Sequence, residues 1–186
     1  MTYEIFGTYK RGVLQRVFRQ STQQIKLKKL VSYEPKSTIP AGDSCKNGEY
    51  ILYHSGQKDG RTNRYTHNGI YIIANDGGEA KFKLTNGAFA YTDHCICLRA
   101  ENDAMTILLA NYLQMISAKI TYEGFVGSGL KNIDRQYFND IKIPIVSNAE
   151  NVAVCFIKID DIINAHNAFL EQLVTEKQAM LQQMFI

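Results

Sequence analysis

The chain has 186 residues, enough for one globular domain with added elements, and its 45% hydrophobic and 21% charged residues exclude a disordered protein. Its net charge of +3 is unevenly spread: residues 1–36 hold eight Lys or Arg against two Glu, which favours a basic patch for a polyanion, although a solvated helix face would give the same pattern. No run of 18 or more apolar residues occurs, and MTYEIFGTYKRG lacks the apolar core of a signal peptide, so we expect a cytoplasmic location and no membrane partner.

The first predicted element is a helix near residues 3–19. Positions on one of its faces step by three and four residues, which is the spacing of a helix that packs against another helix. These positions are Tyr3, Phe6, Lys10, Val13 and Val17.

Short strands and turns are predicted to follow. The stretches NGEYILYHSG, HNGIYIIANDGG, EAKFKLTNGAFAYTDHCICLRA and NDIKIPIV carry alternating or brief apolar runs, separated by Gly, Asn and Asp. One amphipathic helix interrupts them near residues 104–116, and strand or loop resumes at GFVGSGLKNIDRQYFNDIKIPI. The pattern predicts an α+β fold with a mixed, mainly antiparallel sheet.

The last predicted element is a long helix near residues 159–185, for which Asp160 and Asp161 suit the start. We expect it to form an antiparallel, coiled-coil-like pair with the N-terminal helix. The residues expected to pair the helices are Phe6, Val13, Val17, Ile162, Phe169, Leu173, Met180 and Met184. His166 falls in the same seam and is expected to be a packed, hydrogen-bonded side chain.

The two predicted terminal helices contain segments of similar sequence. TYKRGVLQRVF at residues 8–18 aligns without gaps to TEKQAMLQQMF at residues 175–185, which lies 167 positions later. Five of the eleven positions are identical, including the lysines at 10 and 177 and the leucines at 14 and 181. This internal echo predicts that the two segments can fill similar places in a helix pair.

The order of several stretches resembles the DNA specificity subunits of type I restriction-modification systems. These stretches are GEYILYHSG, IIANDGG, FAYTDHCICLRA and SGLKNIDRQYFNDIKIPI, followed by a long helix that ends in KQAMLQQMF. The resemblance covers roughly residues 25–186. It implies a conserved-region helix at 1–20, a DNA target-recognition domain at 21–150 and a second conserved-region helix at 151–186.

The resemblance also implies partners and a division of labour. The expected role is non-catalytic and needs no cofactor or metal: the chain would bind one half of a bipartite target in double-stranded DNA. It would also dock methyltransferase subunits and, through them, the restriction subunit.

Two departures from the family pattern bear on the helices. A full specificity subunit has two recognition domains joined by two long helices, whereas this chain has one recognition domain. The proline-rich turn before the last helix is reduced to Pro144 within IPIVSNAENVAVCFIKIDD. A homodimer through the C-terminal helices would restore two readers, and residues 170–185 of its second copy would compete with residues 3–18 for one place.

The loop SGQKDGRTNRYTHNG at residues 55–69 is the first candidate for DNA contact. Guanidinium groups reach guanine edges, amides reach adenine, and Lys or Tyr holds phosphate, although an ordinary polar loop has a similar composition. The candidates are Gln57, Lys58, Arg61, Asn63, Arg64, Tyr65 and Asn68. Second candidates are Lys81 and Lys83 on one strand face, and Ser128, Lys131 and Asn132 in a glycine-containing turn.

Catalytic interpretations have less support. Asp93, His94 and Cys95 would alternate faces along a strand, so they cannot all converge on one substrate. Cys95 and Cys97 lack the second ligand pair of a structural zinc site, and NDGGEAK lacks the helix that a methyltransferase cofactor loop requires. The alternatives are a stand-alone nucleic-acid-binding regulator or methyltransferase decoy, and a small hydrolase that uses His94.

Overall fold

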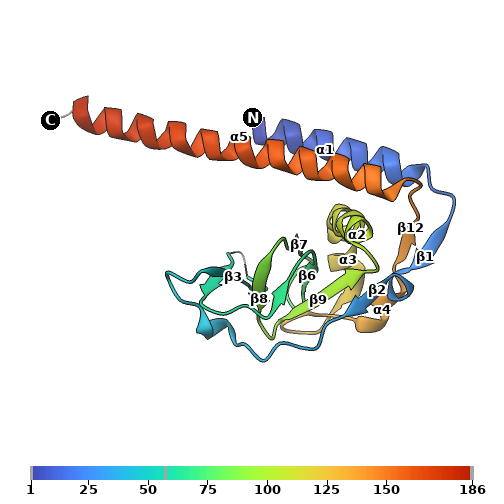
Figure 1. The fold of residues 1–186 in the computed structure, drawn as a ribbon. Helices are drawn as coiled ribbons and strands as arrows, with labels where there is room; N and C mark the ends of the chain where they lie inside the picture. Colours follow the sequence, from blue (N-terminus) through green and yellow to red (C-terminus); the bar gives the residue numbers. More distant parts are fainter. Residues whose placement is uncertain (1, 57, 185–186) are drawn as a thin grey trace.

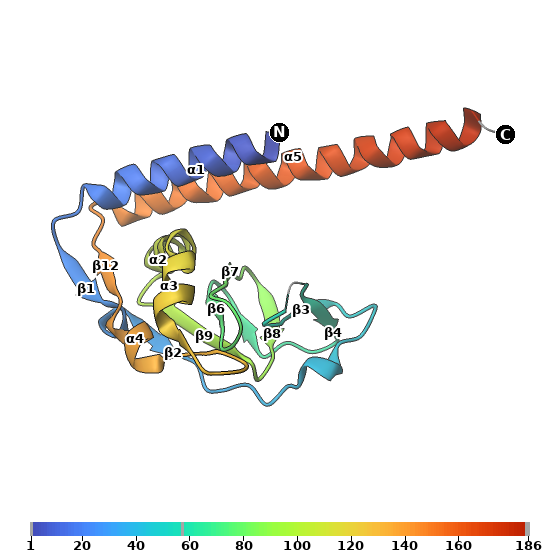
Figure 2. The same ribbon diagram turned by 180° about the vertical axis from the view of Figure 1, so that it is seen from behind.

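The computed structural model describes residues 2–56 and 58–184. A pair of helices, α1 (Thr2–Arg19) and α5 (Ala149–Met184), lies along one side of a central domain that contains all the strands (Figure 1). The two helices run antiparallel, and both views place them side by side (Figures 1 and 2). This arrangement confirms the predicted α+β fold with a helix at each end.

Helix α5 is much longer than α1. Its 36 residues span about 54 Å at 1.5 Å per residue, and α1 covers only its first half. The second half extends past α1 to the C-terminal end (Figure 1). Even so, none of the helices in the described part combines the length and the apolar character needed to cross a membrane.

The strands form two larger sheets and two small ones. The first sheet is antiparallel, in the order β2 (Val31–Tyr33), β9 (Cys95–Ala100), β6 (Ile72–Asn75) and β7 (Phe82–Leu84). The second runs β4 (Gly60–Thr62), β3 (Tyr50–Tyr53), β8 (Ala88–Tyr91) and β5 (His67–Asn68), with β3 and β8 parallel. Two antiparallel pairs complete the domain, β1 (Gln24–Lys26) with β12 (Lys142–Pro144) and β10 (Phe125–Val126) with β11 (Asn132–Ile133).

Helix α2 (Asp103–Met115) joins the central domain to the helix pair because it is apolar on two faces. Leu109 and Leu113 belong to the core cluster built on the first sheet. Ile107 and Leu108 belong to a second cluster, whose other fully buried members are Leu14, Phe18, Ala153 and Phe156 of α1 and α5. The predicted helix near 104–116 is therefore confirmed, and its buried faces fix the helix pair on the domain.

The C-terminal helix begins ten residues earlier than its predicted start at residue 159. It starts at Ala149, after Asn148, which has a positive φ of 57°. Asp160 lies in the interior of the helix and accepts a hydrogen bond from Lys10 of α1. The prediction was wrong because a carboxylate that pairs with another helix resembles, in sequence alone, one that favours a helix start.

Two short helices were not predicted. Helix α3 (Ser117–Gly124) follows α2 directly, and α4 (Arg135–Asp140) lies in a stretch that was expected to be strand or loop. The side chain of Asp134 accepts hydrogen bonds from the backbone N–H groups of Gln136 and Tyr137, at 2.8 and 3.0 Å, and so caps α4. Six residues are too few to show helical periodicity, so only the cap could have indicated this helix.

A cap also holds the start of α2 and gives a first prediction. The side chain of Asn102 accepts a hydrogen bond of 2.9 Å from the backbone N–H of Met105. Replacing Asn102 by alanine should lower the free energy of unfolding by about 1 kcal/mol, because this donor loses its partner. Urea denaturation followed by circular dichroism measures the change. Asn151→Ala, at an exposed position of α5, is the control, and equal stability of Asn102→Ala and wild type would contradict the assignment.

Candidate nucleic-acid interface

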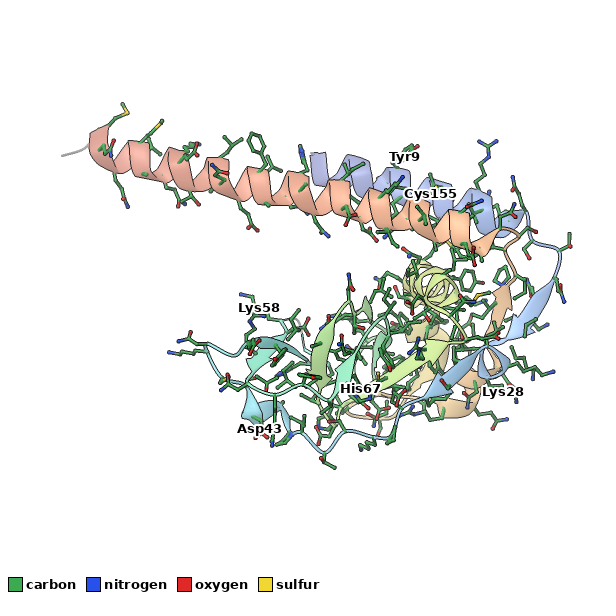
Figure 3. The ribbon with its side chains drawn as sticks, in the orientation of Figure 1. Tyr9, Lys28, Asp43, Lys58, His67 and Cys155 are labelled. Atoms are coloured by element: carbon green, nitrogen blue, oxygen red, sulfur yellow. The ribbon has the colours of Figure 1, made fainter. Side chains whose placement is uncertain are left out.

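The segment between β3 and β6 presents six of the candidate DNA-contact residues at its surface. Two short strands, β4 and β5, divide it into loops instead of the single loop expected from the sequence. The candidates Lys58, Arg61, Asn63, Arg64, Tyr65 and Asn68 are all exposed, whereas Gln57 lies outside the described residues. In Figure 3, Lys58 lies at the end of the domain farthest from Lys28, on the side that faces the helix pair.

The arginines of this segment carry little pairing that would restrain them. The Arg64 side chain is 75% exposed, and its guanidinium lies 3.8 Å from the Asp43 carboxylate, a distance too long for a strong ion pair. Arg61 is exposed on β4. Tyr65 is 52% exposed, and its ring meets that of Tyr50 edge-on, with centroids 5.0 Å apart. Free guanidinium groups beside a braced aromatic ring suit contact with a polyanion.

The loop between β3 and β4 is anchored at its base by residues from the other sheet. The ammonium of Lys83, on β7, donates to the Asp59 carboxylate at 2.5 Å and to the carbonyl oxygen of His54 at 3.0 Å. The same carboxylate accepts from the backbone N–H of His54 at 3.1 Å. The side chain of Asn75, only 3% exposed, donates to the carbonyl oxygen of Ser55 at 2.8 Å. We call Lys83, Asp59 and Asn75 the loop clamp.

The loop clamp changes the role expected for Lys83. The Lys83 side chain is 22% exposed and bound to Asp59, so it holds the loop and is poorly placed to reach a phosphate. Lys81, the other candidate on this face, lies just before β7 and is half-buried. The sequence could not reveal the clamp, because Asp59 is 24 positions away from Lys83.

The second candidate segment forms the hairpin of β10 and β11. Ser128, Lys131 and Asn132 are exposed, and the hairpin is hydrogen-bonded to the turn that follows β6. Gly78 N–H donates to the Lys131 carbonyl at 2.8 Å. Gly127 has a φ of 137°, and a Cβ there would lie 2.9 Å from the Leu130 carbonyl oxygen, so the turn needs glycine.

The two candidate segments meet at the end of strand β6. Asn75 binds the loop after β3. At the next residue, Asp76, the backbone carbonyl accepts a hydrogen bond from the N–H of Ile133 at 2.9 Å, and the carboxylate accepts one from the Arg135 guanidinium at 3.1 Å. The chain therefore brings together, at one edge of the first sheet, loops that are more than 70 residues apart in the sequence. Loops held on a rigid sheet are the usual bearers of binding function.

The residues considered for catalysis do not form a site. Asp93 and His94 lie in the turn between β8 and β9, so the expectation that they continue a strand with Cys95 was wrong. Their side chains are 3.9 Å apart, and the His94 side chain is 67% exposed. Another histidine, His67, labelled in Figure 3, packs its ring on Phe89, with centroids 5.5 Å apart. Within residues 2–56 and 58–184, no three His, Cys, Asp or Glu side chains are grouped to hold a metal ion.

Cys95 and Cys97 are core residues of β9. Both are buried, and burial raises the pKa of each thiol, which therefore remains protonated at neutral pH. Cys155 is exposed on α5. A thiol reagent should therefore modify Cys155 in the native protein and reach Cys95 and Cys97 only after unfolding. Mass spectrometry of labelled peptides checks this, and native labelling of Cys97 would contradict the packing described.

The helix-pairing candidates fall into two groups. Val13 and Val17 are half-buried in the seam of α1 and α5, where Leu14 and Phe18 are 6% exposed. The others on α5 are exposed: Ile162, Phe169, Leu173, Met180 and Met184. The side chain of Phe6 lies outside the described residues. His166 is partly buried.

A family model matches most of the chain. Residues 20–176 match the type I restriction modification DNA specificity domain. Among curated proteins, no match was found.

Solved structures share the fold at low sequence identity. A type I restriction-modification S subunit from M. genitalium matches 75% of this chain and 39% of its own, with a TM-score of 0.62 and 18% identity. The HsdS subunit from Thermoanaerobacter tengcongensis matches 88% and 45%, with a TM-score of 0.57 and 11% identity. A chain from a structure of type I R-M complex assembly and conformational transition matches 98% and 50%, with a TM-score of 0.63 and 11% identity.

The chain thus spans half or less of the length of these structural relatives. The family model matches the whole central domain and most of α5, because its match extends from residue 20 to residue 176. The chain belongs to the type I restriction-modification DNA specificity domain family.

Proposed function

We propose that this chain recognises one half of a bipartite sequence in double-stranded DNA and docks methyltransferase subunits, and through them the restriction subunit. The observation that carries the proposal is the set of exposed Arg, Asn, Lys and Tyr side chains between β3 and β6. They project from a loop region that Lys83 and Asn75 anchor to a sheet. No catalysis and no cofactor are part of this function.

The chemistry of these side chains suits reading and holding DNA. Arg61 and Arg64 present planar forks of donors that match the O6 and N7 acceptors of guanine. Asn63 and Asn68 present an amide that matches the N6 and N7 atoms of adenine. Lys58 and Tyr65 supply phosphate contacts, as do Lys131 and Ser128 from the β10–β11 hairpin. Lys81 and Asn132 complete the proposed contact set.

The helix pair is the proposed docking surface for the methyltransferase subunits. Its outer face is uncovered along all of residues 168–184. A homodimer formed through α5 would supply a second reader, and its target would then be an interrupted palindrome.

In vitro selection from randomised DNA duplexes, using the intact chain, tests the proposed recognition. We expect enrichment of a short motif, and an affinity for it that falls steeply as salt rises, because lysine and arginine release counterions from phosphate. Absence of an enriched motif together with a flat salt response would contradict the proposal.

A stand-alone nucleic-acid-binding regulator, or a decoy that occupies the methyltransferase, is the second candidate. Co-purification with a type I methyltransferase subunit, followed by a methylation assay on the selected duplex, distinguishes the roles. Methylation supports the specificity subunit. Co-purification without methylation supports the decoy, and DNA binding without co-purification supports the regulator.

A further inference from the structure

The two similar segments of the internal echo lie in opposite environments. In α1, Leu14 is 6% exposed and packed in the cluster with Ala153 and Phe156 of α5. The equivalent residue near the other end of the chain, Leu181, is 43% exposed. Met184, equivalent to Val17, is 76% exposed. One copy of the echo is therefore docked, and the other has no partner within the described residues.

The docked copy defines a register. Lys10 of α1 binds Asp160 of α5 at 2.5 Å, and the antiparallel course of the helices brings Leu14 beside Phe156 in the shared cluster. Lys177 is the equivalent of Lys10. A second α5 laid in the place of α1 would put its Lys177 against Asp160 and its Leu181 against Phe156. The seam lysine and the apolar positions of the two segments match, whereas Arg11 and Arg16 correspond to Gln178 and Gln183.

The same register is symmetric for two copies. If the Lys177 of one copy meets Asp160 of the other, the antiparallel course makes the reverse contact form as well. The two-fold axis then passes midway between these positions, at Ala168 and Phe169. Residues 169–184 of each helix cover residues 153–168 of the other, so the exposed half of one α5 fits the half that α1 now covers. Leu181 and Met184, now exposed and equivalent to Leu14 and Val17 of the seam, would then be buried.

We infer that α1 occupies the docking site for the C-terminal half of α5 from a second copy of this chain, and that the two exchange. The inference rests on the homodimer of the proposed function and adds its regulation. When the segments exchange, the contacts between α1 and α5 are replaced by equivalent contacts between two copies of α5. Because the two sets of contacts are alike, a single charge in the seam can shift the balance between monomer and dimer. A displaced α1 permits two readers, whereas a docked α1 holds the chain as a single reader.

Three charge reversals in the intact chain test the exchange by sedimentation equilibrium. Lys10→Glu places a carboxylate opposite Asp160 and should strengthen dimerisation roughly tenfold or more, since two seams are affected in each dimer. Lys177→Glu should weaken dimerisation by a similar factor. Lys158→Glu, at an exposed position two residues before Asp160 and therefore on the opposite side of α5, is the matched control and should leave it unchanged.

A double variant that exchanges the two seam charges tests the register itself, independently of the three single variants. In Asp160→Lys with Lys177→Asp, the new lysine repels Lys10 but attracts the new aspartate of the second copy, so dimerisation should strengthen. Equal dimerisation constants for the Lys10, Lys177 and Lys158 variants would overturn the inference, as would weaker dimerisation in the charge-exchanged chain. Affinity for a duplex with one half-target, measured on the same variants, should not change. If the wild-type chain did not bind this duplex, the result would contradict the proposed function and not the exchange.

Discussion

Replacing Arg61 and Arg64 together by alanine is expected to weaken binding to the selected DNA target by about 2–6 kcal/mol, from about 1–3 kcal/mol for each bidentate contact to guanine. Both side chains are exposed, and Arg64 is only loosely associated with Asp43. Their removal costs the central domain only the long, exposed contact between Arg64 and Asp43, so the loss should appear in binding and not in stability. Fluorescence anisotropy with the selected duplex measures it.

The control for this variant carries the same change in charge. Arg16 and Arg19 are exposed on α1, outside the loop region, and their double replacement by alanine should affect all DNA sequences slightly and equally. His94→Ala should leave binding intact, because His94 lies in a turn and is not a proposed contact. If the two double variants lost the same affinity, Arg61 and Arg64 would contribute only net charge.

Replacing Lys83 by methionine is expected to reduce the preference for the selected duplex over unrelated DNA by roughly tenfold or more, because base contacts supply the preference and need a fixed loop. Lys83 binds Asp59 and the carbonyl of His54, and both belong to the base of that loop. The dependence of the logarithm of affinity on the logarithm of salt should keep its slope, since Lys83 does not contact phosphate in this account.

Lys58→Met provides the contrast. Lys58 is exposed on the same loop, so its loss should weaken binding to all sequences and reduce the salt slope by about 0.9. Asn75→Ala, which removes the other anchor, should repeat the Lys83 effect. A salt slope that fell in Lys83→Met as it does in Lys58→Met would assign Lys83 to phosphate and refute its positioning role.

The most predictable parts of the fold were the helices with a buried face, because burial imposes a regular spacing of apolar residues on their sequence. The predicted face of α2, formed by Ile107, Leu108, Tyr112 and Met115, placed the helix correctly, and these residues belong to the cluster shared with α1 and α5 or pack against it. The start of α5 was misplaced because Asp160 serves a contact with α1 that lies 150 residues away in the sequence. Local capping rules cannot detect a contact of that kind.

The candidate interface was predictable in composition but not in geometry. The exposed Arg and Asn residues between β3 and β6 were identified because the family resemblance favoured DNA contact over an ordinary polar loop of similar composition. Their anchoring by Lys83 and Asn75 depends on the neighbouring sheet, which only the fold defines. A strand lysine that faces solvent and one that binds a loop have the same sequence pattern, so Lys83 was first assigned to DNA contact.

The most direct test of the account is the ratio of two affinities of the intact chain at near-physiological salt. One is measured for the duplex obtained by selection, and the other for a duplex of the same length and composition in scrambled order. The account predicts that the selected duplex binds roughly 100-fold more tightly or better, and that Arg61→Ala with Arg64→Ala removes most of this ratio. Equal affinity for the two duplexes would contradict sequence recognition by this domain.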